Sequence, residues 1–168
     1  LGYTDHLLTM SEVYSLWAIE GDEKIAAVLS FAAADKGVVI TPDIHVFKEL
    51  KLRLLNGTHS LSCAVAFLSG IVSVKEAMDN PVISKFANDL MTKEIARAIP
   101  YDLPQEDALA FAGKVLDRFR NPSIEHHWIN ISLNYTSKLE MRIAQVLLRY
   151  AELYKSVPEN MALGFAAY

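Results

Sequence analysis

Residues Phe47 to Gly70 read FKELKLRLLNGTHSLSCAVAFLSG, and the periodicity of this stretch decides the interpretation of the fold. At about 100° per residue, and with Lys51 taken as zero, six apolar side chains fall in one stripe between roughly 260° and 320°. They are Phe47, Leu50, Leu54, Leu61, Val65 and Leu68. Leucine, alanine and cysteine are interspersed over the rest of the surface. A helix that is apolar nearly all round is typical of a buried one, so the stretch predicts a long buried helix.

Three polar residues interrupt this helix. Lys51, His59 and Asn56 fall at about 0°, 80° and 140°, on a face separate from the apolar stripe. The axial rise from Lys51 to His59 is about 12 Å, and a lysine side chain can close about half of it. Desolvation would turn the lysine into a base, and the amide and imidazole can donate to a substrate oxygen. Spacing alone leaves two interpretations open, a ligand pocket or buried polar residues that only satisfy nearby loops.

The composition is that of one folded domain. The chain has 168 residues, of which 52% are hydrophobic and 21% charged. A net charge of -4 with scattered basic residues gives no support for a nucleic-acid or acidic-membrane partner. No apolar run is long enough for a membrane span and no secretory signal is visible, so the cytoplasm is the expected location. The single cysteine, Cys63, is expected to be a small buried hydrophobic residue.

Helix signals recur along the chain, and strand signals are scarce. Asp22 is predicted to cap one helix, and Asp43 to cap the helix of interest. The β-branched patch KGVVITPDI, residues 36–44, is the exception, and Pro42 prevents a long strand through it. We expect the fold class to be all-α.

Two further observations concern the second half of the chain and its glycines. The dipeptide Asn121-Pro122 predicts the start of a helical stretch, with a break near Asn134. The seven glycines form neither a G-x-G-x-x-G turn nor a phosphate loop. The sequence therefore carries no recognisable nucleotide-binding motif.

Three blocks of the sequence, in order, resemble the polyol-specific long-chain dehydrogenases, the mannitol dehydrogenase family. KLRLLNGTHS, residues 51–60, resembles the family's K-x4-N-x2-H motif. EVYSLWAIEG, residues 12–21, resembles its E-P-F-x-x-W-V-I-E stretch. DRFRNPSIEHHWINISLNYTSK, residues 117–138, resembles its R-F-x-N-P segment followed by S-K. The likeness is greatest to the hexuronate branch, that of the tagaturonate reductases (altronate oxidoreductases).

The resemblance implies an NAD-dependent oxidoreductase that interconverts a keto-hexuronate and its hydroxy acid, of the tagaturonate/altronate type. It implies that Lys51 is the general acid/base, that Asn56 and His59 hold and polarise the substrate oxygen, and that no metal takes part. Lys138 would contact the polar chain of the substrate, and Glu20 is a weaker substrate-site candidate. The expected partners are a small sugar acid or polyol and an N-terminal Rossmann-type domain of the same protein, with neither nucleic acid nor membrane.

By the same resemblance, residues 1–168 are expected to be a truncated, multi-helical C-terminal substrate domain. The dinucleotide-binding domain, which would hold most of the NAD, is expected outside the chain. Mannitol-type members have an arginine where this chain has Asn130, which favours the hexuronate branch but leaves the partner of a substrate carboxylate unassigned. Arg53, at about 200° on the helix, faces away from the three polar residues.

The sequence leaves alternative interpretations open. Within the family, the substrate could be fructuronate or a plain polyol such as mannitol. In another class, the chain could be a non-catalytic helical interaction module. His126 and His127 beside Glu125 could suggest a metal site, but adjacent helical residues point about 100° apart, which disfavours it. Trp17 and Trp128 are expected to serve packing rather than ligand stacking.

Overall fold

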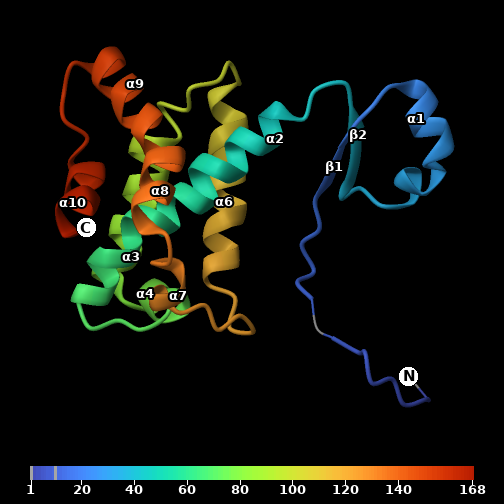
Figure 1. The fold of residues 1–168 in the computed structure, drawn as a ribbon, viewed down its shortest axis with the longest axis horizontal. Helices are drawn as coiled ribbons and strands as arrows, with labels where there is room; N and C mark the ends of the chain where they lie inside the picture. The colour runs from blue at the N-terminus through green and yellow to red at the C-terminus, as the bar shows by residue number, and fades with distance from the viewer. Residues whose placement is uncertain (1, 10) are drawn as a thin grey trace. The chain divides into compact units, whose positions relative to one another are not determined.

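The computed structural model describes residues 2–9 and 11–168 (Figure 1). The chain divides into two compact units, Leu1–His45 and Val46–Tyr168. Apart from one two-stranded sheet in the first unit, the regular structure of the described residues is helical, which confirms the predicted fold class.

The first unit is a short β-α-β arrangement. Its elements are β1 (Trp17–Glu20), α1 (Glu23–Val28), η1 (Ser30–Ala34, a 3-10 helix) and β2 (Val38–Thr41). The two strands pair in parallel, from Trp17 opposite Val38 to Glu20 opposite Thr41. The β2 strand ends directly before Pro42, as expected for a residue that has no backbone N–H to donate.

The predicted cap of the first helix is confirmed. The carboxylate of Asp22 accepts hydrogen bonds from the backbone amides of Lys24 and Ile25 at 3.0 and 3.1 Å. These bonds satisfy N–H groups that have no partner within the helix itself. The helix is shorter than its alanine-rich sequence suggests, because α1 ends at Val28 and a 3-10 turn follows.

The regular structure of the second unit is helical (Figure 1), and several of its helices include a π-helical turn. Its elements are α2 (His45–Leu50), η2 (Lys51–Gly57), α3 (Thr58–Leu68), α4 (Val74–Asp79), α5 (Pro81–Asp89), η3 (Leu90–Ile95), α6 (Gln105–Phe119), α7 (Trp128–Ile131), α8 (Tyr135–Leu139), η4 (Glu140–Ala144), α9 (Gln145–Tyr154) and α10 (Glu159–Ala167). The segments η2, η3 and η4 are π-helical; η2 and η4 have α-helix on both sides, whereas η3 ends the helix that begins with α5.

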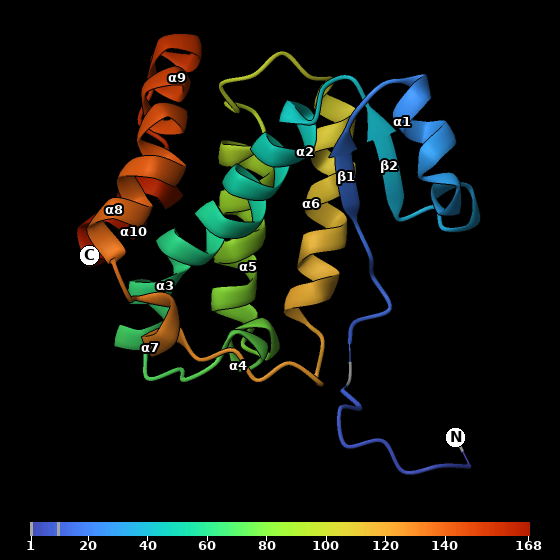
Figure 2. The same cartoon turned by 45° about the vertical axis from the view of Figure 1, so that its right-hand side comes forward.

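The continuous helix α2–η2–α3 lies at the centre of this unit. Its α3 part packs against α5, α7 and α10, and its η2 part packs against α6, η3 and η4. Figure 2 shows α6 running alongside the helix that contains α5 and η3. The predicted burial of this helix is confirmed for its central turns. None of the helices in the described part of the chain is long and apolar enough to cross a membrane.

The predicted apolar stripe is buried only in part. Leu50, Leu54 and Leu61 are buried, whereas Leu68 is 72% exposed. A π-helical turn advances through a smaller angle per residue than an α-helical turn, so residues after η2 are displaced around the axis. Cys63 is buried and donates to the carbonyl of Trp128, which confirms its predicted role in the core.

The predicted helix start at Asn121-Pro122 is wrong, because the helix begins only at Trp128. The intervening segment is extended where it pairs with residues 72–74: the amide of Val74 donates to His126 O, and the amide of Trp128 donates to Val72 O. The predicted break is confirmed. Asn134 adopts a left-handed conformation, with φ of 53°, and α8 begins after it.

Candidate active site

The candidate site is built on η2 and the first turn of α3. In η2 the backbone hydrogen bonds run between residues five apart, so Lys51 and Asn56 lie closer together around the axis than the 140° expected of a regular helix. Turns of this kind are frequent at functional sites. A helical projection of the sequence assumes about 100° for every residue, so it could not reveal this π-helical turn.

Two arginines join η2 to η4 in a reciprocal way. Arg53 Nη1 donates to the carbonyls of Met141 and Arg142 at 2.8 and 2.9 Å. In return, Arg142 Nη1 donates to the carbonyl of Asn56 at 3.2 Å and to Ser60 Oγ at 2.9 Å. Each arginine therefore satisfies backbone carbonyls in or beside the opposite π-helix. These bonds fix the backbone that carries Asn56, and Arg53 is occupied by structural contacts.

Gly57 allows the two π-helices to approach closely. A Cβ atom at this position would lie 2.5 Å from Ile143 Cδ1, nearer than side-chain carbons can come. Both residues are buried. The space beside Asn56 that a glycine leaves is thus filled by a side chain of η4.

His59 is enclosed by aromatic rings and is only 9% exposed. Its ring stacks on Phe119 with centroids 4.2 Å apart, and the rings of His126 and Trp128 meet it edge-on at 5.1 and 6.1 Å. Within the described structure, His59 Nε2 is buried without a hydrogen-bond partner. An unsatisfied buried polar atom costs about 1–3 kcal/mol, which makes this nitrogen a candidate contact for a ligand.

The surroundings of His59 keep its ring neutral. Burial is the main cause that lowers the pKa of His59 from 6.5 to about 3, and the positive charges of His126, Arg142 and Arg118 lower it further. A neutral imidazole has one donor and one acceptor nitrogen. At pH 7 this ring can therefore bind a hydroxyl or carbonyl oxygen without itself carrying charge.

The expected burial of Lys51 is wrong for this chain. Lys51 is exposed and Asn56 is half-buried, whereas His59 is buried. The side of η2 that packs against its neighbours carries Arg53, Leu54 and Gly57 instead. The three predicted residues thus share one helix, and their exposure decreases from Lys51 to His59.

Lys138 lies beside the His59 cluster. It is half-buried, and its Nζ donates to the carbonyl of Ile131 at 2.8 Å. Burial lowers the pKa of His126, and the charges of Lys138 and His127 lower it further. The sequence analysis considered His126 only as a possible metal ligand and not as a neighbour of His59, although it falls within the block of residues 117–138.

The adjacent histidines have different neighbours, although they lie on an extended segment and not on the predicted helix. His127 Nε2 lies 3.0 Å from Glu125 Oε1, whereas the ring of His126 contacts that of His59. The pair therefore offers no shared metal site. Trp128, with 1% of its surface exposed, belongs to the core, and Trp17 stacks on Phe31 within the first unit.

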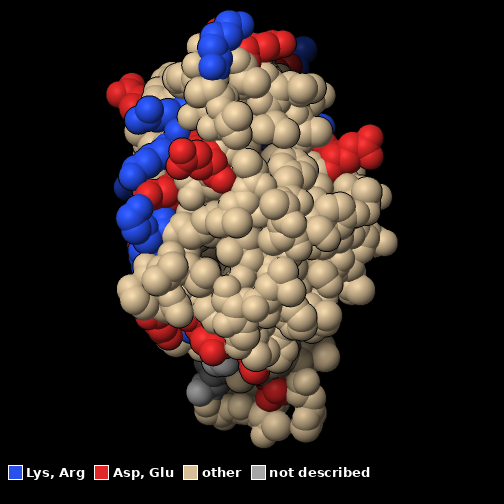
Figure 3. Space-filling view, turned by 90° about the vertical axis from the view of Figure 1, so that its left-hand side faces the viewer, with Lys and Arg blue, Asp and Glu red and all other residues tan. Residues whose placement is uncertain are grey.

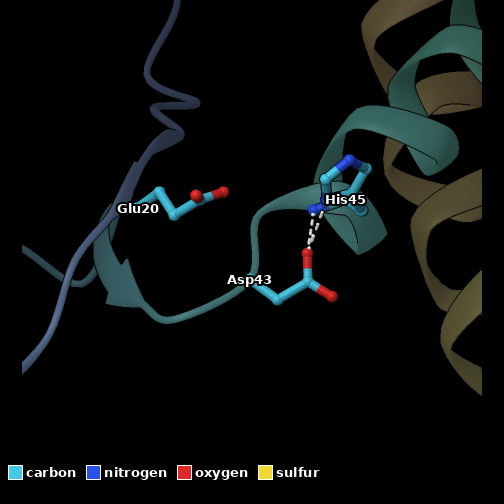
Figure 4. A group of neighbouring side chains, drawn as sticks. All are labelled: Glu20, Asp43 and His45. Atoms are coloured by element: carbon cyan, nitrogen blue, oxygen red, sulfur yellow. Dashed lines mark hydrogen bonds and ion pairs between the residues drawn. The ribbon is translucent and has the colours of Figure 1, made fainter.

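Glu20 belongs to the first unit, whereas the other four predicted site residues belong to the helical unit. Its carboxylate points toward Asp43 and His45, and one ligand atom of each lies within 4.8 Å of the others (Figure 4). Asp43 Oδ1 accepts from the backbone amide of His45 at 2.7 Å and lies 2.8 Å from His45 Nδ1. All three side chains are exposed. The bond from Asp43 satisfies the backbone amide of His45, the first residue of α2.

A separate groove of about 390 Å³ lies in the helical unit. It is lined by Val65, Leu68, Ser69, Val82, Ile83, Phe86, Leu163 and Ala167. The face of the molecule shown in Figure 3 likewise has a broad area without charged side chains. Only one lining side chain, that of Ser69, is polar, so the groove offers little to a polyhydroxylated ligand.

The sequence of the chain matches a known family model. Residues 43–168 match the model described as the mannitol dehydrogenase C-terminal domain. Altronate oxidoreductases of Yersinia enterocolitica and Bacillus subtilis are each 38% identical over 167 residues, 99% of this chain and 34% of theirs. The enzyme of Bacteroides thetaiotaomicron is 34% identical over 165 residues. The chain thus spans about a third of the length of the curated relatives it matches.

Solved structures have the same fold. Pseudomonas fluorescens mannitol 2-dehydrogenase, in a ternary complex with NAD and D-mannitol, aligns with a TM-score of 0.69 at 24% identity, over 90% of this chain and 30% of the other. A D-sorbitol dehydrogenase in substrate-free form aligns with a TM-score of 0.68 at 22% identity, over 79% of this chain and 27% of the other. At these identities the likeness concerns the fold.

Proposed function

The chain belongs to the mannitol dehydrogenase family through its C-terminal domain, and from this premise we propose that it forms the substrate-binding and catalytic domain of an NAD-dependent oxidoreductase. The proposed reaction interconverts a keto-hexuronate and its hydroxy acid. Similarity to altronate oxidoreductases over 99% of the chain supports this substrate class. The observation that carries the proposal is the buried, neutral His59, with an unpartnered Nε2, on the helix that also bears Lys51 and Asn56.

In the proposed mechanism, Lys51 removes the hydroxyl proton of the hydroxy acid during oxidation and returns it during reduction. The side-chain amide of Asn56 and the neutral ring of His59 hold the same substrate oxygen and stabilise the charge that develops on it. Lys51 is exposed in this chain, so its action as a base depends on the substrate and the rest of the protein covering it. The mechanism assigns no role to a metal.

The turn between β1 and α1 does not fit a dinucleotide site. The turn between β1 and α1 contains a single glycine, Gly21, and the Asp22 carboxylate already accepts the amides at the start of α1. A pyrophosphate would need those amides and would be repelled by that carboxylate. We therefore propose that NAD, which supplies or accepts the hydride, is bound mainly by a Rossmann-type domain outside this chain.

Replacement of Lys51 tests the proposal. In the complete protein, Lys51→Ala should lower kcat by about 10²- to 10⁴-fold, because the proton transfer loses its catalyst. Circular dichroism should remain unchanged, since Lys51 is exposed. Lys114→Ala, which removes an exposed lysine from α6, is the matched control and should retain full turnover. If Lys51→Ala keeps turnover within tenfold of the native protein, the general acid/base role is wrong.

The substrate is tested separately from the mechanism. The complete protein should reduce tagaturonate with NADH faster than fructuronate or fructose, the latter being the keto partner of mannitol. A preference for fructose would assign the chain to the mannitol-type alternative within the family. No turnover of any of the three would favour the non-catalytic helical module.

A cytoplasmic location remains a prediction.

A further inference from the structure

Lys138 and Arg142 form a pair of like charges four residues apart on the helix α8–η4. Such pairs repel each other on a helix, and both side chains are half-buried, where the repulsion is less screened. Lys138 Nζ donates to Ile131 O, and Arg142 Nη1 donates to Asn56 O and Ser60 Oγ. Among the residues that the structure describes, neither cation makes an ion pair with a carboxylate.

These two cations flank the buried histidine of the candidate site. The charge of Arg142 helps to lower the pKa of His59, and the charge of Lys138 helps to lower that of His126, whose ring contacts His59. Burial lowers the pKa of Arg142, and within the described part of the chain no acidic group opposes this effect. Positive charges that are partly buried and unpaired destabilise a fold, and such costs are typical of ligand-binding sites.

We propose that Arg142, beside Lys138, receives the carboxylate of the substrate. The inference rests on the proposed function and names the residue that would select sugar acids over uncharged polyols. Only Nη1 of Arg142 is used in the described hydrogen bonds, so the remaining N–H groups of its planar guanidinium are available to a carboxylate. Asn130, on α7, is exposed and uncharged, whereas Arg142 supplies a positive charge from a different element.

The same arginine that binds the carboxylate also holds the carbonyl of Asn56. A substrate carboxylate bound to the Arg142 guanidinium would thus affect the backbone position of Asn56, the residue proposed to hold the reacting oxygen. An uncharged polyol offers this arginine only a hydroxyl oxygen, which binds it more weakly than a carboxylate does. The contribution of Arg142 should therefore appear as discrimination between substrates rather than as general activity.

The test uses the complete protein with two substrates that differ in charge, altronate and the uncharged altritol. Arg142→Gln keeps an amide N–H for the Asn56 carbonyl but removes the charge. It should lower the ratio of kcat/KM for altronate to that for altritol by about 10- to 100-fold, mainly through a higher KM for altronate. Arg142→Lys should restore part of this ratio. Arg149→Gln, on the exposed side of α9, is the matched control and should leave it unchanged.

A second measurement does not depend on a variant. In the native protein, acetate should compete with altronate and raise its KM. The proposal is overturned if Arg142→Gln lowers both kcat/KM values equally, which is the result of a purely structural role, or if acetate leaves the KM for altronate unchanged. A native protein that turns over no sugar acid at all would instead refute the proposed function on which the inference rests.

Discussion

The ring of His59 makes the stability of the fold depend on pH. Its pKa is about 3 in the folded chain, against 6.5 for an ordinary histidine. Above pH 6.5 the ring is neutral in both states and contributes no pH dependence. Between pH 6.5 and 3 only the unfolded state binds the proton, so the free energy of unfolding falls as the pH falls, by up to about 1.4 kcal/mol per pH unit.

Chemical denaturation at several pH values checks this expectation. Between pH 6.5 and 5.5 the native protein should lose about 1 kcal/mol more of its unfolding free energy than His59→Gln does. Replacing the exposed His6 by Gln removes no buried ring and should leave the native pH dependence intact. If the free energy of unfolding depends on pH equally in the native protein and in His59→Gln, the ring takes up a proton in the folded state as well.

At the same scale, the sequence predicted the candidate residues but not their environments. Lys51, Asn56 and His59 were found from their spacing and from a family resemblance. Their exposure depends on neighbours distant in the sequence: Phe119 encloses His59, whereas no described element buries Lys51. Burial of a side chain is a property of packing, which local periodicity indicates only on average.

At the scale of elements, the contact between η2 and η4 depends on Gly57. Replacing a helical glycine by alanine usually stabilises a protein by about 1 kcal/mol. Here the new Cβ would lie 2.5 Å from Ile143 Cδ1, and overpacking of this kind costs about 1–3 kcal/mol. We therefore expect Gly57→Ala to lower the free energy of unfolding, as measured by urea denaturation.

Two further variants isolate the cause. Gly113 lies on α6, where a Cβ atom would meet no described atom within 4 Å, so Gly113→Ala should raise stability by about 0.5–1 kcal/mol. Ile143→Val removes the clashing carbon and should recover part of the loss in the double variant with Gly57→Ala. If Gly57→Ala stabilises the protein as Gly113→Ala does, the two helices are not in close contact.

The elements themselves were predictable where the signal is local. Asp22 caps its helix, β2 ends directly before Pro42, and the helix is interrupted at Asn134, because each feature depends on one residue's own backbone or side chain. The π-helical turns and the late start of α7 were not predictable. They depend on the arginine bonds across η2 and η4 and on the pairing of residues 72–74 with 126–128, which join distant segments.

At the scale of the whole molecule, the chain spans about a third of the length of its curated relatives. We expect residues 1–168 alone not to oxidise NADH in the presence of tagaturonate, since they include no dinucleotide-binding motif. Absorbance at the NADH band measures this directly, with the complete protein as the positive control. Turnover by the isolated chain would place the dinucleotide site within these residues and refute the proposal that NAD is bound mainly by a domain outside them.

The sequence by itself determined the helical class of the chain, the helix that bears Lys51, Asn56 and His59, and the family resemblance. These follow from local periodicity and from the order of residues along one segment. Only the tertiary structure decided that His59 is neutral, that a π-helical turn shifts Asn56 toward Lys51, and that Arg142 reaches Asn56 from 86 residues away. The reason is physical: a pKa, a close approach and a hydrogen bond between distant segments all depend on which surfaces the folded chain brings into contact.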